Sequence, residues 1–426
     1  MGDVTRATQT TAGAADNPIE HAEEDRLGRV PFAVHFANEL TSLDAKQGFV
    51  TALMGRWGSG KTSLLNLVAE EIKKDNDIVV LHFNPWMFSG TDALVGSFFR
   101  ELSAQLRLTR GTRFGQIADQ LEAYGELLNP LVWLPVVGPW MGRARSLFGG
   151  VKKVKDASAK SVGEERKLIQ DALKKLEHPL VVIVDDIDRL SSQEIQDIFK
   201  LVRLTANFPN MVYVLAFDRD RVESALSSDG ISGRKYLEKI VQLGVDLPAP
   251  APADLLKELQ TALGLMMTDL GDTELFDEKL WPDTLMDIIF PLIESLRDVR
   301  RYAASSRTAV RALKDQVELN DLLALEAIRV FAPDAFAAIR RAPEALTTTR
   351  TLGLGALTSD GDHKQLVEDI LQTGPDSDFM RTVLRRLFPA SIRHFENNSY
   401  GSDWLSEWLR DRRVAHSDIL LSLIHI

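Results

Sequence analysis

Short apolar segments alternate with helical patterns over the first half of the chain. Phe49–Met54 (FVTALM), Val181–Val184 (VVIV) and Val212–Phe217 (VYVLAF) are rich in apolar and β-branched residues and have the length of buried strands. Each run precedes a segment whose apolar residues recur at helical spacing, which is typical of parallel strands joined by helices. We therefore predict an α/β fold with a mostly parallel sheet sandwiched by helices.

The pattern changes at Leu247–Ala253 (LPAPAPA), a stretch of prolines and alanines that marks a domain boundary. From about residue 254 onward, helical periodicity dominates, as in DLLKELQTALGLMM and QLVEDILQTG. We predict a disordered leader at 1–24, a core at 25–250, a helical lid at 251–310 and a helical region of unknown role at 311–420. The fold prediction thus includes an α-helical C-terminal region.

The last six residues, LSLIHI at 421–426, match the translation of a common transposon-based sequencing adapter. We interpret them as an adapter-derived tail and expect the native C-terminus to be missing. The alternative is a genuine apolar terminal strand.

Composition narrows the classes of function. The 426 residues, 45% of them hydrophobic, suffice for two domains, and the absence of cysteine excludes disulfides and cysteine chemistry. A net charge of −11 makes nucleic acid an unlikely partner, because phosphate binding needs concentrated lysine and arginine. The first 18 residues lack the apolar core of a signal peptide, and no apolar run reaches 18 residues. We expect a cytoplasmic protein without an ordinary membrane span.

A phosphate-binding loop follows the first predicted strand directly. GRWGSGKT, Gly55–Thr62, is followed by the helical pattern SLLNLVAEEIKK, so strand, glycine loop and helix occur in the order that a P-loop requires. Glycines let backbone N–H groups curl around a phosphate, Lys61 reaches the β- and γ-phosphates, and the Thr62 hydroxyl can ligate Mg²⁺. The predicted cofactor-binding residues are Gly55, Gly58, Ser59, Gly60, Lys61, Thr62 and Ser63.

Two carboxylates follow the second predicted strand, in the sequence VVIVDDIDRL. Asp185 ends that strand, where open α/β sheets place their ligands, and we assign it to Mg²⁺ together with Thr62. We assign Asp186 to orienting or deprotonating the attacking water. Glutamate is more usual in that role, so slow hydrolysis is expected. The Asn-Lys-x-Asp motif of GTPases is absent, which favours ATP.

Two further assignments stay open from the residues alone. Asp188 and Arg189 form either a helix-start cap with a local ion pair or a direct element of coupling or subunit contact. Asp218, at the end of the third predicted strand, is either the N-cap of a helix beginning near Arg219 or a γ-phosphate sensor. For Asp218 the cap is the favoured interpretation.

Taken in order, these segments resemble the KAP family of P-loop NTPases. The motifs are DRLGRVPFAVHFANEL, HFNPWMFSG, VVIVDDIDRL, VLAFDRDRV, KYLEKIVQLGVDLP and SLRDVRRYA, over about residues 25–310. The resemblance implies an additional-strand ATPase related to AAA+ and signalling NTPases, with Arg297 or Arg300 as a nucleotide-sensing arginine. The alternative for these arginines is the solvated face of a helix. Trp86 is expected to support the P-loop, its alternative being a core aromatic.

An insertion at roughly 108–162 separates the two phosphate motifs, where many KAP proteins carry transmembrane helices. Its apolar part, Leu127–Gly142, contains three prolines and is too short and broken to cross a bilayer. Arg143–Lys160 adds six cations and one acid. One hypothesis is contact of 127–160 with an anionic membrane surface, at the inner face of the membrane. The alternatives are a hairpin packed on its own domain or on a protein partner, and a nucleic-acid patch.

These observations predict ATP hydrolysis with Mg²⁺ as cofactor, with Lys61, Asp186 and Arg297 or Arg300 as the catalytic residues. The resemblance alone implies a conformational switch in bacterial defence or membrane-associated signalling, with protein partners or self-association. A weakly hydrolysing nucleotide-dependent scaffold or membrane tether is the alternative. A nucleic-acid-stimulated ATPase is a second alternative, which the acidic charge disfavours.

Overall fold

Two compact units make up the part of the chain that the computed structural model describes. That part comprises residues 17–75, 77–90, 94–110, 114–132, 151–227, 232–271, 275–313, 315–349, 356–396 and 398–424. The first unit is Asn17–Ala249 and the second begins at Pro250. Each is described by itself below.

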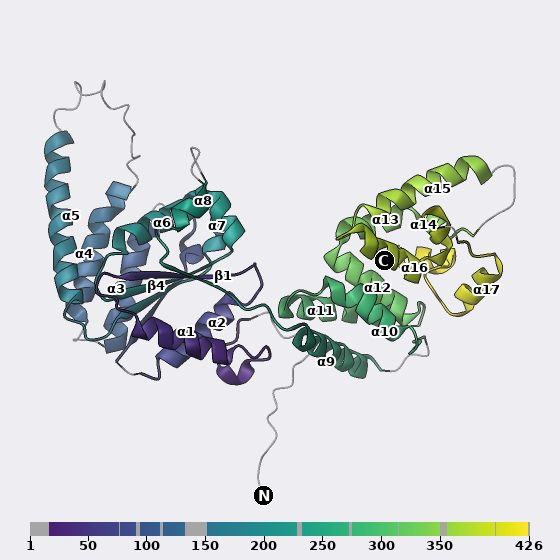
Figure 1. The fold of residues 1–426 in the computed structure, drawn as a ribbon, viewed down its shortest axis with the longest axis horizontal. Coiled ribbons are helices and arrows are strands. Elements are labelled where there is room, and N and C mark those ends of the chain that lie inside the picture. The colour runs from purple at the N-terminus through teal and green to yellow at the C-terminus, as the bar shows by residue number, and fades with distance from the viewer. Residues whose placement is uncertain are drawn as a thin grey trace, which may run out of the picture. The chain divides into compact units, whose positions relative to one another are not determined.

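The first unit is built on a sheet of five parallel strands in the order β2-β3-β4-β1-β5 (Figure 1). The strands are β1 (Phe49–Met54), β2 (Val79–Phe83), β3 (Leu180–Val184), β4 (Met211–Phe217) and β5 (Leu243–Asp246). The predicted strands at 49–54, 181–184 and 212–217 are confirmed to within one residue, and so is the predicted fold class. β4 lies between β1 and β3, so an additional strand separates the strand before the glycine loop from the strand before the paired aspartates.

Helices cover both faces of this sheet (Figure 1). Successive side chains of a strand point to opposite faces, so each strand contributes to two cores. Leu53, Val181 and Ile183 pack with α1 (Val30–Ser42) and α2 (Lys61–Ile72). The opposite face packs against α3 (Leu94–Arg110), α4 (Gly115–Val132), α5 (Val151–Leu173), α6 (Ser192–Thr205), α7 (Arg219–Leu226) and α8 (Gly233–Leu237).

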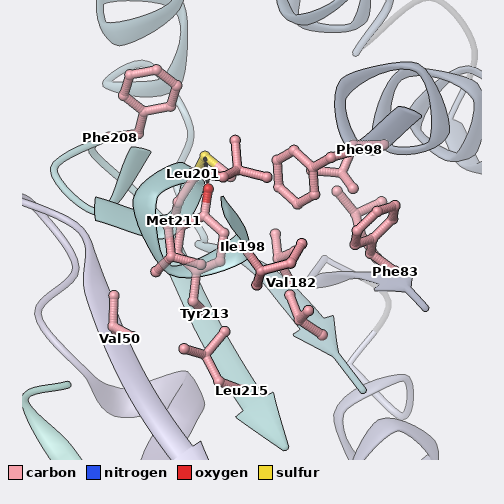
Figure 2. Packing of buried hydrophobic residues seen from close by; sticks show 14 of the residues in the cluster. Val50, Phe83, Phe98, Val182, Ile198, Leu201, Phe208, Met211, Tyr213 and Leu215 are labelled. Carbon is pink, nitrogen blue, oxygen red and sulfur yellow. Dashed lines mark hydrogen bonds between the residues drawn. The ribbon is translucent and has the colours of Figure 1, made fainter. Parts of the chain in front are cut away.

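Aromatic side chains pack among the aliphatic ones in the second of these cores (Figure 2). The rings of Phe83 on β2 and Phe98 on α3 meet edge to face at 5.1 Å between centroids. Tyr213 on β4 lies beneath Phe98 and is fully buried. Burying each such ring contributes about 1.5–3 kcal/mol relative to leaving it exposed. This packing fixes the relative positions of the strands, and therefore of the loops at their carboxyl ends.

The beginning of the predicted insertion belongs to the same core. Phe114, Ile117, Leu121, Tyr124 and Leu128, on or just before α4, are buried against α3 and the sheet. α4 continues to Val132, and residues 133–150 lie outside the described residues, as do the side chains at 151–161. The membrane hypothesis for 127–160 therefore stays a prediction. Among the helices that the structure describes, none is both long and apolar enough to pass through a bilayer.

The second unit is helical, and its core is formed by its own apolar side chains. Short helical turns η5 (Leu285–Ile289), η6 (Phe290–Leu292) and η7 (Pro389–His394) interrupt its longer helices. These helices are α9 (Pro252–Leu270), α10 (Trp281–Thr284), α11 (Leu296–Leu313), α12 (Leu319–Phe331), α13 (Pro333–Arg341), α14 (Pro343–Thr347), α15 (Ala356–Leu371), α16 (Ser377–Leu387), α17 (Asp403–Arg410) and α18 (Ser417–Ile424). The expected α-helical C-terminal region is confirmed, whereas the adapter-derived origin of 421–426 stays a prediction.

Candidate functional site

The glycine loop joins the carboxyl end of β1 to the first residue of α2. Gly58 and Gly60 have φ angles of 79° and 93°, in the left-handed region that glycine adopts without strain. Gly60 is also the N-cap of α2, so the loop ends where unpaired backbone N–H groups and the helix dipole favour an anion. The Gly55 N–H donates to the Phe217 carbonyl of β4 at 3.2 Å, which anchors the start of the loop on the sheet.

Lys61 is buried beside this loop, and its ammonium group has three acceptors. It donates to the Gly55 carbonyl at 2.9 Å, to the Arg56 carbonyl at 3.3 Å and to Asp188 Oδ2 at 3.0 Å. The side chains of Lys61 and Asp188 are only 8% and 6% exposed, so little solvent screens this pair. A phosphate in the loop would meet a cation that is already held at the correct edge of the sheet.

Asp185 and Thr62 form a compact set of oxygen donors. The Asp185 carboxylate accepts hydrogen bonds from the Thr62 hydroxyl and, at 2.8 Å, from the Asp186 N–H. Burial raises the pKa of Asp185 above its ordinary value, opposed mainly by the Thr62 hydrogen bond. Hydroxyl and carboxylate oxygens are the ligands that Mg²⁺ prefers, and Mg²⁺ sites commonly use few protein ligands beside phosphates. The donor set therefore fits that ion.

Asp186 is held on both carboxylate oxygens. Asn84, which follows β2, donates from Nδ2 to Asp186 Oδ2 at 2.8 Å, and Arg189 Nε donates to Oδ1 at 2.7 Å. The backbone of Asp186 has a φ of 59°, which is uncommon for a residue with a side chain. Non-glycine residues in this region cluster at functional sites, where the surrounding structure compensates the strain.

Of the interpretation of Asp188 and Arg189 as a helix-start cap with a local ion pair, the structure contains the ion pair, between Arg189 and Asp186, but no side-chain cap on the turn. Asp188 and Arg189 belong to the short turn η4 (Ile187–Arg189), and each pairs with a different catalytic candidate. Asp188 pairs with Lys61, whereas Arg189 pairs with Asp186. The partners of Asp188 lie in segments far away in the sequence, so no local pattern could have revealed them.

Arg189 also lies against two tryptophans. Its guanidinium carbon is 5.7 Å from the ring centroid of Trp57 in the glycine loop and 5.1 Å from that of Trp86 in η2 (Pro85–Phe88). Trp86 is 50% exposed, so its alternative as a core aromatic is wrong. Both rings are in range for cation–π attraction, which connects η4 with the glycine loop.

Asp218 combines its expected cap with a contact to the glycine loop. Its Oδ1 accepts from the Arg221 N–H at 3.2 Å, which caps α7. Its Oδ2 accepts from the Trp57 N–H, also at 3.2 Å. The structure therefore contains the capping bond that was favoured, and it also places this carboxylate beside the loop.

Arg29 is a buried residue of this site that sequence reasoning did not single out. It is 7% exposed, and it donates to the Ser59 carbonyl at 2.7 Å and to the Pro248 carbonyl at 3.0 Å. Its guanidinium lies so close to Gly60 that a Cβ there would come within 2.6 Å of Nη1. Burial lowers the pKa of Arg29 from its ordinary value. The sequence placed Arg29 in the motif before α1, but no local pattern indicated that its side chain would be buried.

The remaining predicted residues fall into two groups. Ser59 Oγ donates to the Arg56 carbonyl at 2.6 Å, and Ser63 Oγ accepts from the Ile19 N–H at 3.3 Å. Arg297 and Arg300 lie on α11, which belongs to the second unit, whereas the glycine loop belongs to the first. Their predicted role in sensing nucleotide stays a prediction.

The sheet order, the glycine loop after β1 and the paired aspartates after β3 define a nucleotide-binding P-loop NTPase domain. The chain matches the KAP family P-loop domain over residues 29–311, more than half of its length. This protein belongs to that family, as the resemblance noted from the sequence implied.

Curated relatives are known at moderate identity. The chain is 28% identical over 388 residues to the phage T7 exclusion protein of Escherichia coli K12, an alignment that covers 84% of this chain and 51% of that protein. It is 24% identical over 213 residues to the aliphatic sulfonates import ATP-binding protein SsuB 2 of Agrobacterium fabrum, covering 48% of this chain and 73% of the relative. The chain thus spans about half the length of the phage exclusion protein.

Solved structures provide a weaker likeness. Cdc6p from Pyrobaculum aerophilum aligns at 13% identity with a TM-score of 0.38, covering 96% of this chain and 97% of that one. The ORC2 protein of Aeropyrum pernix aligns at 12% identity with a TM-score of 0.33, covering 96% of each chain. Scores this low carry no argument about function.

Proposed function

We propose that this protein binds ATP with Mg²⁺ and hydrolyses it to ADP and phosphate, and that the reaction drives a conformational switch. The observation that carries the proposal is the convergence of Lys61, Asp185 and Asp186 at the edge of one sheet, beside a glycine loop that begins a helix. These are the parts that phosphoryl transfer to water needs, because its catalysis is mostly positioning and charge stabilisation.

The glycine loop and Lys61 have the task of binding the phosphates. Backbone N–H groups of Gly58–Thr62 would surround the β- and γ-phosphates, and the ammonium group would neutralise negative charge on them. Thr62 and Asp185 would hold Mg²⁺, which supplies further neutralisation of phosphate charge when it is bound. The hydrogen bond between the Thr62 hydroxyl and the Asp185 carboxylate supports this pairing of roles.

Asp186 would orient the attacking water and accept its proton. The water oxygen forms a bond to the γ-phosphorus while the bond from that phosphorus to the β–γ bridging oxygen breaks. The electron pair of the broken bond stays on ADP, where Lys61 offsets its charge. In this proposal an arginine of α11, Arg297 or Arg300, completes the site from the lid.

A second candidate function is a nucleotide-dependent scaffold that hydrolyses slowly. The observation that favours it is the engagement of both Asp186 oxygens by Asn84 and Arg189, which leaves that carboxylate less able to hold a water. Aspartate is also shorter than the glutamate that is usual in this role. Turnover at saturating ATP separates the two functions.

For the biological use of the cycle, we propose a part in the exclusion of phage. The support is the alignment with a phage T7 exclusion protein over 84% of this chain. Expression of the chain in a susceptible bacterial host, followed by challenge with phage T7, tests this use through plating efficiency. Equal plating with and without the chain contradicts it.

The proposed reaction is tested by equilibrium binding of ATP and by release of phosphate, each with and without Mg²⁺. Lys61→Ala is expected to abolish nucleotide binding, lowering affinity by about 10²-fold or more, since it removes the buried cation beside the loop. The matched control is Lys74→Ala, an exposed lysine on the same segment whose loss leaves binding unchanged. Wild-type protein that binds no ATP would contradict the proposal.

Adding anionic liposomes or DNA to the same assay separates the remaining alternatives. Stimulation by anionic vesicles supports membrane-associated signalling, and stimulation by DNA supports the nucleic-acid-stimulated ATPase. A rate that neither addition changes supports a switch that acts on protein partners. Flotation of the wild type and of a variant lacking 127–160 tests the membrane contact directly.

A further inference from the structure

Every N–H bond of the Lys61 ammonium group has an acceptor within the protein. An ammonium group has three donors, and its three acceptors here are two carbonyls of the glycine loop and one oxygen of Asp188. A phosphate oxygen can therefore bind this ammonium only by replacing one of them. Asp188 is the one acceptor of the three that belongs to a different segment of the chain and carries a full negative charge.

Asp188 is connected to the rest of the site through its own short turn. Its Oδ2 also accepts from the Asp218 N–H at 3.1 Å, and its backbone carbonyl accepts from Arg221 Nε at 3.3 Å. The next residue, Arg189, binds Asp186 and lies against Trp57 and Trp86. Asp188 and Arg189 are neighbours in the three-residue turn η4, so a shift of that turn would move both side chains.

We propose that Asp188 is the displaceable counter-ion of Lys61, and that a triphosphate which takes its place releases Asp186 from Arg189 through η4. Asp188 is thus a positioning residue that sets nucleotide affinity and links occupancy of the glycine loop to the water-binding carboxylate. This inference rests on the proposed binding of nucleotide triphosphate.

Charge decides the direction of the exchange. A triphosphate brings several negative charges and several acceptor oxygens to a buried cation, whereas Asp188 brings one charge. Removing the Asp188 charge leaves Lys61 without its ionic partner until phosphate binds. The Asp188→Asn variant should therefore be less stable alone and should bind triphosphate more tightly than the wild type.

The test uses inorganic tripolyphosphate and ATP as probes of the full chain. Asp188→Asn is expected to bind both about tenfold more tightly, a change equivalent to about 1.4 kcal/mol. Its midpoint of thermal unfolding should lie below that of the wild type without ligand, and the gap should narrow at saturating tripolyphosphate. The matched control is Asp197→Asn, a buried acid paired with Lys200 on α6, which should change stability equally under both conditions and leave affinity unchanged.

Arg189 supplies a second readout through the two tryptophans. In the wild type, triphosphate should change tryptophan emission, because Arg189 leaves the rings of Trp57 and Trp86. Arg189→Met should keep triphosphate binding but lose this change, and Trp57→Phe with Trp86→Phe identifies the rings that report it.

The outcomes separate the inference from the proposed function. Wild type that binds neither probe overturns both. The inference alone is overturned if the wild type binds the probes and Asp188→Asn binds them equally or more weakly. It is also overturned if the difference in unfolding midpoint between the two proteins does not narrow at saturating tripolyphosphate. Because Trp57 lies in the glycine loop and can respond to phosphate directly, this readout is taken in a Trp57→Phe background, where an emission change that persists in Arg189→Met overturns the link from Asp188 to Asp186.

Discussion

Two turns meet at the same edge of the sheet, and they are built by opposite means. The glycine loop, Gly55–Thr62, presents mainly backbone groups, and glycines at left-handed φ angles shape it. The turn η4 after β3 presents charged side chains, and the non-glycine residue before it, Asp186, adopts a left-handed φ. The loop therefore presents backbone N–H groups as its binding groups, whereas the charged side chains at the turn depend on ion-pair and hydrogen-bond partners from other elements.

This difference determines what each turn contributes. Backbone N–H groups at a helix start attract any phosphate of suitable shape, so the loop provides binding. Asp186 and the side chains of the turn are paired with Lys61, with Asn84 and with one another, and in the proposed mechanism they act after binding. Variants that affect one turn and spare the other test this division.

The largest effect is expected at Asp186. Asp186→Ala should retain ATP binding within about twofold and lose about 10²–10⁴-fold in turnover, since it removes the group that orients water in the proposed mechanism. Binding and phosphate release measured on the same preparation check this. Asp220→Ala, an exposed acid on α7, is the control. Unchanged turnover in Asp186→Ala would remove Asp186 from the mechanism.

A smaller effect, on stability, is expected at Arg29, which donates a hydrogen bond to the Ser59 carbonyl of the glycine loop. Arg29→Met should lower the free energy of unfolding by about 2–3 kcal/mol, because the Ser59 and Pro248 carbonyls lose buried donors. Urea unfolding without nucleotide measures it, with Arg26→Met, at an exposed position three residues earlier, as control. If Arg29→Met unfolds at the same urea concentration as the wild type, the hydrogen bonds from Arg29 to the Ser59 and Pro248 carbonyls do not stabilise the fold.

The pH dependence of stability should distinguish the buried Asp185 from an ordinary surface acid. Burial raises the pKa of Asp185, so its ionised form is disfavoured in the folded protein. Its contribution to stability is present at low pH and is lost as pH rises through its folded pKa. Without nucleotide, Asp185→Asn should therefore gain stability relative to the wild type between about pH 4 and about pH 8.

Urea unfolding at both pH values measures this gain, and Asp44→Asn, an acid whose side chain is 71% exposed, is the control. A difference between Asp185→Asn and wild type that stays constant with pH would show that the carboxylate titrates alike in the folded and unfolded chains.

The smallest effect is expected at Asp218, which touches both turns. Asp218→Ala should cost about 1 kcal/mol through loss of the α7 cap, and Asp218→Ser should recover most of it because serine also caps. Turnover should change little in Asp218→Ser. A serine variant of normal stability that has lost turnover would instead identify Asp218 as a γ-phosphate sensor.

Much of the first unit could be predicted from local patterns. The strands β1, β3 and β4 are short apolar runs that no competing helical periodicity obscures, and their limits were predicted to within one residue. α7 begins at Arg219, as the capping position of Asp218 indicated. These features depend on residues close together in the sequence, so the local sequence is sufficient to predict them.

The partners of charged side chains could not be predicted in the same way. Asp188 and Lys61 are 127 residues apart, and Arg29 meets Pro248 across 219 residues. Which acid reaches Lys61 depends on strand order and on the length of each turn, neither of which a local pattern encodes. For the same reason, Trp86 could not be recognised as half-exposed beside Arg189.

The sequence by itself determined that this chain has a P-loop, because glycine, lysine and threonine at fixed spacing act through backbone geometry that is local. It also determined the strands β1, β3 and β4 and indicated the family to which the chain belongs. Only the tertiary structure decided that Asp188 neutralises Lys61, that Asn84 and Arg189 hold Asp186, and that Arg29 braces the loop. Those pairs form because the sheet brings the ends of distant strands to one edge, where buried charges must find partners.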